Sequence, residues 1–509
     1  MAVLIGTDLG TSSLKILLIN TKGEVLSMAS RAYQFDSPHP GYAQQDPEVW
    51  WEAFCESLKE AIKKADISRE EIKGIGFSGQ MHGLVMLDKD LRSVRPAILH
   101  CDTRSAEQVR MIREKLSEAG VRELMMNSVY CGFMLPSLLW VREKEKENYE
   151  RIAHILFPKD YLRMRLTGIV CSDYSDASAS LMFDLKKGEW SKEIMEAFEI
   201  PPSMPAKCFG TAERTGSLTK EAAQLTGLPR SLAVAAGGGD QVMQGIGNGI
   251  TGMNRACLNI GSSAQLSFQS KAPLCNPALS TNTFCGYEKN RWIVMGAMMS
   301  AGLSMQWCMR LLGKTDYQGL NEAVAKVAPG SGGVIFLPYL NGERTPHMNP
   351  DISGAFLGLN LHTGAPELAR SVMEGVVFAL CQCMELCREM GLEARDYLIS
   401  SGGGAKSEEW LQMQSDIFHM PIRIAAVQEQ ACLGAAIAAG VGAGIYADIE
   451  EGCAALVRYE ERICLPESRR HERYMEYYQI FKEAYPANAS LLNRLTLLGR
   501  EGMKQFGSE

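Results

Sequence analysis

Asp240 stands where a carboxylate could take part in phosphoryl transfer. It follows the apolar run 232–236 and three glycines, so it lies at the end of a predicted strand where the backbone is exposed. A carboxylate in that place can accept the proton of an attacking hydroxyl, as phosphoryl transfer to an alcohol requires. An N-cap is an equal alternative, because the helix-compatible Val242-Met243 follows. The segment alone leaves both interpretations open.

Asp8 lies in a second polar turn, Asp8-Leu9-Gly10-Thr11-Ser12-Ser13, with Lys15 just behind it. Hydroxyls, backbone N–H groups and a lysine suit the β- and γ-phosphates of a nucleotide, and an aspartate can hold hydrated Mg²⁺ through its waters. Asp-x-Gly-Thr alone is often only a turn. Two more turns of this kind, Gly261-Ser262-Ser263 and Gly402-Gly403-Gly404, bring the number suited to phosphate or nucleotide to three.

The elements around these turns follow one plan twice. Predicted strands 3–7 and 14–20 flank the first turn, and strands 256–260 and 264–268 flank Gly261-Ser262-Ser263. Strands that alternate with helices indicate an α/β architecture. We therefore expect two related domains, 1–250 and 251–509, that face one cleft, with the glycine-rich segment 245–252 as a hinge or linker.

Short sequence patterns predict the helices and strands around these turns. Asp46 followed by Pro47 predicts a helix start, and Ser105 with Gln108 forms a capping-box pattern. A strand at 397–400 leads into the glycine turn 402–404, and Ser407 is expected to cap the next helix. Strand, glycine turn and helix start together let a ligand approach the backbone closely, although a tight connection without a ligand has the same pattern.

The composition restricts the class of protein. The chain has 509 residues, 46% of them hydrophobic and 22% charged, as in globular proteins of two domains. The net charge of −7 argues against nucleic acid and anionic membrane as partners. The longest uncharged stretch, 431–447, contains four glycines and predicts a close-packed helix and a turn rather than a membrane span.

The cysteines and histidines point to no metal or disulfide framework. Fifteen scattered cysteines without an export signal are expected to be reduced thiols in a cytoplasmic protein. Eight dispersed histidines, with no HExxH or CxxC pattern, argue against a zinc site. The sequence leaves a homodimer open.

Several motifs resemble the FGGY carbohydrate kinases of the actin-like ATPase superfamily, over essentially the full length. Residues 354–359, continued through 367–374, fit one family signature, and residues 133–140 fit the other except that Ser137 occupies a usual lysine position. Further similar segments are 159–162, 166–168 and 176–178. The resemblance implies two actin-like (ribonuclease H-like) α/β domains around a cleft. It also implies transfer of the γ-phosphate of ATP, with Mg²⁺, to a small sugar.

Within the family, Ser78-Gly79-Gln80-Met81-His82-Gly83 is similar to the substrate motif of members that phosphorylate D-xylulose. Glycerol kinases have Arg-Glu in place of Met-His. The segment 341–347 adds to this similarity, whereas His100-Cys101 departs from the usual Trp-Asn-Asp. Taken alone, His82 would be a core histidine and Met81 ordinary packing.

The resemblance also implies roles for single residues. Asp240 would be the catalytic base, and Asp8 the carboxylate that holds Mg²⁺ through water. The residues implied for the sugar are Gln80, Met81, His82, Asp102 and Gln241. The residues implied for the nucleotide, together with the turn Thr11, Ser12, Ser13 and Lys15, are Gly261, Ser262, Gly302, Gln306, Gly403 and Gly404.

Two alternatives stay open. One is an FGGY kinase for another ketose or polyol, such as L-xylulose, ribulose, fuculose or erythritol. The other is a nucleotide-dependent assembly or sensor protein on an actin-like fold without kinase activity. The presence of Asp240 together with Met81-His82 argues against the second.

Overall fold

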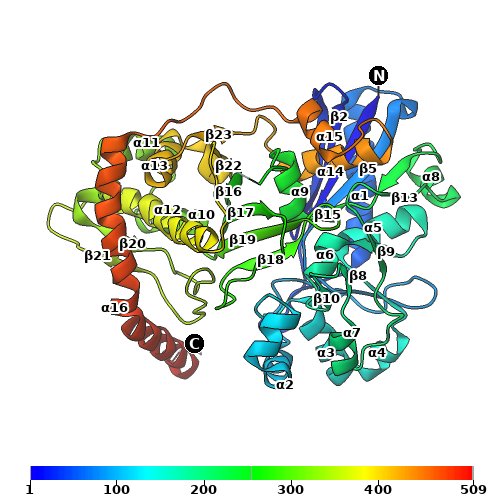
Figure 1. Cartoon of the computed structure of the whole chain (residues 1–509), viewed down its shortest axis with the longest axis horizontal. Helices are drawn as coiled ribbons and strands as arrows, with labels where there is room; N and C mark the ends of the chain where they lie inside the picture. Colours follow the sequence, from blue (N-terminus) through cyan, green and yellow to red (C-terminus); the bar gives the residue numbers. More distant parts are fainter. Residues whose placement is uncertain (1, 254, 507–509) are drawn as a thin grey trace.

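The computed structural model describes residues 2–253 and 255–506, and it contains two large mixed sheets (Figure 1). The first sheet has the order β13-β14-β5-β1-β2-β3, with β15 paired to β5. Its strands are β1 (Val3–Leu9), β2 (Ser13–Asn20), β3 (Val25–Ala32), β5 (Ile72–Gly79), β13 (Arg214–Gly216), β14 (Ala233–Ala235) and β15 (Gly238–Gly239). The predicted N-terminal hairpin is confirmed, because β1 and β2 pair antiparallel.

The second sheet repeats the centre of the first. Its order is β18-β19-β17-β16-β22-β23. The antiparallel hairpin β16–β17 lies beside the parallel strand β22, just as β1–β2 lies beside β5. The strands are β16 (Ala256–Ile260), β17 (Ala264–Ser270), β18 (Asn282–Cys285), β19 (Trp292–Met298), β22 (Leu398–Gly402) and β23 (Ile422–Ile424). The predicted α/β class with a duplicated plan is confirmed.

The starts of two helices show which of the predicted capping patterns are correct. Helix α1 (Pro47–Ala65) begins as predicted, because the Asp46 side chain accepts the Glu48 N–H and proline occupies the first turn. Helix α2 (Ala106–Leu124) begins after Ser105, but the predicted capping box is wrong. Ser105 has φ −87° and ψ 23° and makes no side-chain cap bond, whereas an N-cap residue is normally extended. The Gln108 amide instead donates to Glu143 Oε2 at 2.7 Å.

Helix α14 (Gln430–Gly442) belongs to the C-terminal part of the chain but packs on the first sheet. In Figure 1 the orange helices α14 and α15 (Ile449–Leu456) lie beside the blue strands of that sheet. The contact is close because β1 and β5 present glycines to the helix. A Cβ on Gly6 would lie 1.8 Å from the Cys432 carbonyl oxygen, and one on Gly76 would lie 2.0 Å from that of Ala435. The helix predicted within 431–447 is therefore confirmed, with its small residues used for packing.

The glycines at 245–249 are not the predicted hinge. Gly245 and Gly247 belong to helix α9 (Asp240–Gly247), which crosses α14 at close range. A Cβ on Gly247 would lie 1.8 Å from the Gln430 carbonyl oxygen, so this segment is a rigid helix crossing. Gly252, by contrast, has no neighbouring atom within 4 Å of such a Cβ. A domain boundary near residue 250 stays a prediction, and the structure adds that α14 packs on the first sheet and α15 on α14.

Several long helices complete the second half, notably α10 (Gly302–Leu311), α12 (Ala365–Glu389), α13 (Glu408–Phe418) and α16 (Ser468–Phe506). Helix α12 packs along β19 and β17. Within the described part of the chain, no helix combines the length and the apolar character that crossing a membrane requires.

The close contact between α14 and the first sheet generates a stability prediction. In Gly76→Ala the new methyl would meet only α14 backbone, which cannot move aside cheaply. Overpacking of this kind costs about 1–3 kcal/mol, which should lower the apparent Tm by roughly 2–10 °C. Differential scanning calorimetry measures this change. Gly252→Ala is the matched control, and an equal Tm for the two variants would contradict the proposed packing constraint.

Candidate active site

Three strand ends bring the predicted catalytic residues together. In the parallel part of the first sheet, Asp8 pairs with Ser78, and Gly239 pairs with Gly79. The carboxyl ends of β1, β5 and β15 therefore meet at one edge, which carries Asp8, the segment after Gly79, and Asp240 as the first residue of α9. Residues more than 200 positions apart in the chain thus share one site.

The two carboxyl groups at this edge influence each other. Ser78 Oγ donates to Asp8 Oδ1 at 2.7 Å, yet burial raises the pKa of Asp8. Burial, and next the nearby charge of Asp8, raise the pKa of Asp240 to about 7, while hydrogen bonds from Gln241 act in the opposite direction. A carboxyl with a pKa near neutrality can take a proton readily at neutral pH, as a general base must.

The turn after β1 lies over the same edge. Thr11 Oγ1 donates to Gln80 Oε1 at 3.2 Å, Ser12 is exposed, and Ser13 begins β2. Lys15 is held in an ion pair, because its Nζ lies 2.6 Å from Glu429 Oε2, directly before α14. Nothing in the local sequence around Lys15 predicts this partner, which is more than 400 residues away in the chain.

The predicted sugar residues form the next part of the edge. The Nδ1 of His82 lies 3.0 Å from the Ala179 carbonyl oxygen, so Nδ1 carries the proton and Nε2 is left as an acceptor. Burial lowers the pKa of His82 to about 3, which keeps the ring neutral. Its ring lies between Phe133, with centroids 4.0 Å apart, and Phe284, at 5.6 Å.

The two residues before His82 add a packing contact and an unpaired hydrogen-bond donor. A Cβ on Gly239 would lie 2.6 Å from Met81 Cγ, so the Met81 side chain packs against the strand end that carries Asp240. Gln80 is buried, and its Nε2 has no hydrogen-bond partner within the described residues. Because an unpaired buried donor is costly, this N–H is suited to a ligand oxygen.

Asp102 does not offer a free carboxylate to a sugar, contrary to the role that the sequence analysis implied. It is 1% exposed, and the Ala43 N–H donates to its Oδ2 at 2.6 Å. The guanidinium of Arg104 binds both of its oxygens, with Nε at 3.0 Å from Oδ1 and 2.9 Å from Oδ2. These partners occupy the carboxylate, so Asp102 holds the loop that carries His100 and Cys101.

The predicted nucleotide residues assemble at one edge of the second sheet. Ile260 of β16 pairs with Gly402 of β22, which places their following turns side by side. The Gly302 N–H donates to the Gly261 carbonyl oxygen at 2.9 Å, and a Cβ on Gly302 would lie 2.4 Å from that oxygen. The edge therefore includes the N-terminus of α10, where Gln306 is exposed, the turn that contains Ser262, and the turn that contains Gly403 and Gly404.

A network of buried ion pairs lies close to Gly239, the residue before Asp240. Lys159 Nζ is 2.6 Å from both Asp160 Oδ1 and Asp173 Oδ2, and 3.0 Å from Asp176 Oδ2. Ser175 Oγ donates to Asp173 and accepts the Gly239 N–H at 2.9 Å. The network is thus connected to the residue that precedes Asp240. The sequence analysis identified these segments only by resemblance and assigned them no function.

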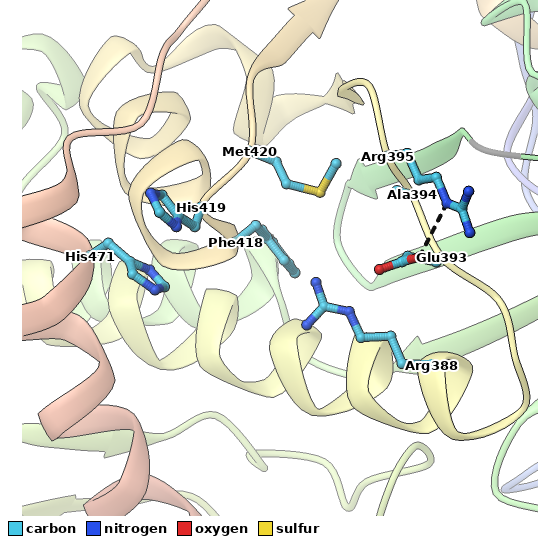
Figure 2. Close-up of a pocket in the computed structure, with 8 residues that line it drawn as sticks. All are labelled: Arg388, Glu393, Ala394, Arg395, Phe418, His419, Met420 and His471. Carbon is cyan, nitrogen blue, oxygen red and sulfur yellow. Dashed lines mark hydrogen bonds and ion pairs between the residues drawn. The ribbon is translucent and has the colours of Figure 1, made fainter.

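A separate surface cavity of about 500 Å³ lies in the second half, away from these edges (Figure 2). It opens where α12 and α13 end and where β22 and β23 begin, so all of β22, roughly 17 Å long, separates it from the turn at Gly403. Arg388 and the exposed His419 lie near the carboxyl ends of the two helices, whose negative partial charge the guanidinium of Arg388 complements. These residues therefore have a structural explanation, and the cavity is not a candidate for the catalytic site.

Comparison with known proteins agrees with this geometry. The N-terminal domain model of the FGGY family of carbohydrate kinases matches residues 3–247, and the C-terminal domain model matches residues 256–443. A xylulose kinase of Lactococcus lactis is 34% identical over 99% of this chain and 100% of its own length. A xylulose kinase of Escherichia coli is 35% identical over 94% of this chain and 98% of its own.

A solved structure gives the same result in three dimensions. The crystal structure of a xyloylose kinase from Brucella ovis superposes with a TM-score of 0.90 and 32% identity, over 96% of this chain and 100% of the other. The chain therefore matches both family domains and covers nearly the full length of these relatives. The chain belongs to the FGGY family of carbohydrate kinases.

Proposed function

We propose that this kinase transfers the γ-phosphate of MgATP to the terminal hydroxyl of D-xylulose and forms D-xylulose 5-phosphate. The observation that carries the proposal is the contact of Met81, the residue before His82, with the strand end that bears Asp240. Relatives that are named xylulose kinases and cover nearly the full chain support the same substrate. Because ATP is a cytoplasmic metabolite, we place the reaction in the cytoplasm.

Asp240 is the proposed base. Its carboxylate removes the proton of the sugar hydroxyl as that oxygen attacks the γ-phosphorus, and the leaving group is ADP. Gln241, which hydrogen-bonds to Asp240, holds the carboxylate in place. The neutral imidazole of His82 accepts a hydrogen bond from a sugar hydroxyl, and the free amide N–H of Gln80 donates one to a sugar oxygen.

The carboxylate of Asp8 is suited to hold the magnesium ion that accompanies ATP. Ser78 occupies its Oδ1, and its other oxygen has no protein partner within the described residues. Burial and the repulsion between Asp8 and Asp240 raise the pKa of Asp240, and a divalent cation bound through water would compensate that negative charge. The cation supplies charge stabilisation to the phosphates, whereas the protein positions them.

The edge of the second sheet is the proposed nucleotide site. Gly403 leaves room for a ligand close to its backbone, whereas Gly302 and Gly404 let the turns pack closely on Gly261 and Ile260. Gln306 is exposed one helical turn further along α10. Thr11, Ser12, Ser13 and Lys15 would face the phosphates from the first sheet. Closure of the two edges around both substrates would exclude water, which could otherwise accept the phosphoryl group.

Substitution of the proposed base tests the mechanism. Asp240→Asn keeps the shape but cannot accept a proton, so kcat should fall about 10²- to 10⁴-fold. The KM for ATP should stay within about twofold, because the nucleotide edge is unchanged. A coupled ADP-release assay measures both constants. A kcat within threefold of wild type would remove Asp240 from the reaction.

The pH dependence follows from the raised pKa of Asp240. The base acts as the carboxylate, so kcat/KM for the sugar should be lost as the pH falls through about 7 and should level off above it. In Asp8→Asn the neighbouring negative charge is gone, so at limiting Mg²⁺, where the cation does not compensate Asp8 in wild type, the midpoint of the residual activity should lie below that of wild type. Steady-state kinetics from pH 5 to 9 test both statements. Identical midpoints in the two proteins would contradict the proposed coupling.

The substrate assignment is tested at His82. Among common ketoses and polyols, D-xylulose should give the highest kcat/KM. His82→Ala leaves a sugar hydroxyl unpaired, which typically costs about 1–3 kcal/mol, so the KM for the sugar should rise roughly 5- to 150-fold. The KM for ATP should hardly change. A tenfold preference for L-xylulose, ribulose, fuculose or erythritol would refute D-xylulose as the substrate and leave the kinase class intact.

A further inference from the structure

The loop that carries Arg344 is fixed on both sides of this residue. Thr345 Oγ1 accepts the Ala297 N–H at 3.0 Å and donates to the Ser280 carbonyl oxygen at 2.6 Å. Glu343 Oε1 accepts the Met299 N–H at 2.9 Å. Both neighbours are buried and are bound to β19 or the residue after it. The backbone at Arg344 is therefore held rigidly by the second sheet.

The side chain of Arg344 reaches across to the first half of the chain. Its guanidinium lies 5.4 Å from the centre of the Tyr130 ring. A row of three rings, Tyr130, Phe133 and His82, begins at this contact. The ring centroids of Tyr130 and Phe133 are 5.9 Å apart, and those of Phe133 and His82 are 4.0 Å apart. The positive charge of Arg344 is close enough to contribute to the lowered pKa values of His82 and His100. Arg344, which belongs to the second half of the chain, thus lies at the end of the row of rings beside the proposed sugar pocket.

The guanidinium has no polar partner there. Within the described residues, Arg344 makes no side-chain hydrogen bond or ion pair. The adjacent carboxyl of Glu343 does not supply one, because it accepts backbone N–H groups of Met299 and Arg344 itself. Burial also raises the pKa of Glu343 to about 8, so this carboxyl is neutral at neutral pH. A half-buried guanidinium with five N–H donors and no acceptor is suited to an acceptor on a ligand.

We infer that Arg344 binds the ketone oxygen of the sugar and so selects ketoses over the corresponding polyols. The inference rests on the proposed function. When the terminal hydroxyl of a ketopentose attacks the phosphate, that oxygen cannot also close a furanose ring, so the reacting sugar is open and its ketone is free. The ketone lies toward the other end of the carbon chain from that hydroxyl. In the pocket, Arg344 likewise lies beyond His82 and Phe133, whereas Met81 touches the strand end of Asp240.

The chemistry of the two partners explains the selectivity. A ketone oxygen only accepts hydrogen bonds and a guanidinium only donates them, so the pair is fully matched. A polyol places a hydroxyl in that position, and its hydrogen finds no acceptor on Arg344. Sites built to pair one polar group discriminate strongly against analogues that cannot complete the pairing.

The experiment compares Arg344→Met and Arg344→Lys with wild type on D-xylulose and on xylitol, its C2-reduced polyol. Xylitol is measured as a substrate or, when turnover is slow, as a competitive inhibitor. Arg344→Met should lose about 10- to 150-fold in kcat/KM for D-xylulose through a higher KM. It should lose much less affinity for xylitol, so that the ratio between the two sugars falls. Arg344→Lys, which keeps a donor, should recover part of the ratio, and the KM for ATP should be unchanged.

Arg388→Met, at the cavity of Figure 2, is the matched control, because it also removes a guanidinium from the second half, at an exposed position outside the proposed sites. It should behave as wild type. An unchanged ratio in Arg344→Met, or equal losses on both sugars together with a lower Tm, would overturn the inference. A raised KM for ATP alone would assign Arg344 to the phosphates and would also overturn it. Wild-type enzyme without activity on D-xylulose would refute the proposed function itself, which is a separate result.

Discussion

The packing of α14 against glycine backbone is the constraint on which the active site depends. The helix contacts β1 and β5 through Gly6 and Gly76, and it crosses α9 at Gly247 and Gly434. These three elements carry Asp8, the Gln80–His82 segment and Asp240. Because each contact is to main chain, none can be relieved by a change of rotamer. One helix from the C-terminal part of the chain thus fixes the relative position of residues from three distant segments.

The electrostatics of the site follow from that burial. Two carboxyl groups share the edge, and their proximity together with desolvation brings the pKa of Asp240 close to neutrality. Behind them the charges are paired, since Lys159 binds three aspartates and the network extends through Ser175 to the Gly239 N–H. At the proposed sugar pocket, burial lowers the pKa values of His82 and His100, so both rings are neutral, and Arg344 makes no ion pair within the described residues. The charges behind the site are therefore paired, whereas Asp8, Asp240 and Arg344, which are proposed to face the substrates, form no ion pair within the described residues. Lys15, which is paired with Glu429, is the exception.

The duplicated hairpins carry different charges at equivalent positions, and this difference fits the two ligands that are proposed for them. Asp8 on β1 pairs with Ser78 on β5, whose hydroxyl donates to it at 2.7 Å. At the same register of the second sheet, Asn259 pairs with Ser401, and the corresponding bond is 3.5 Å. A charged residue at this position suits the hydrated cation, whereas a neutral amide suits a nucleotide edge that must not repel phosphate. The symmetry of the backbone is kept while the charge differs.

The sequence by itself determined the features that depend on a few neighbouring residues. Asp46-Pro47 started a helix, the polar turns followed their strands, and the motif residues indicated phosphoryl transfer. Partners distant in the chain decided the rest. Gly247 became a helix crossing because Gln430 lies against it, Asp102 became a structural group because Arg104 and Ala43 occupy it, and Arg344 joined the pocket through Tyr130. Backbone preferences act over a few residues, but burial, charge coupling and close packing depend on which segments meet, and only the tertiary structure decided that.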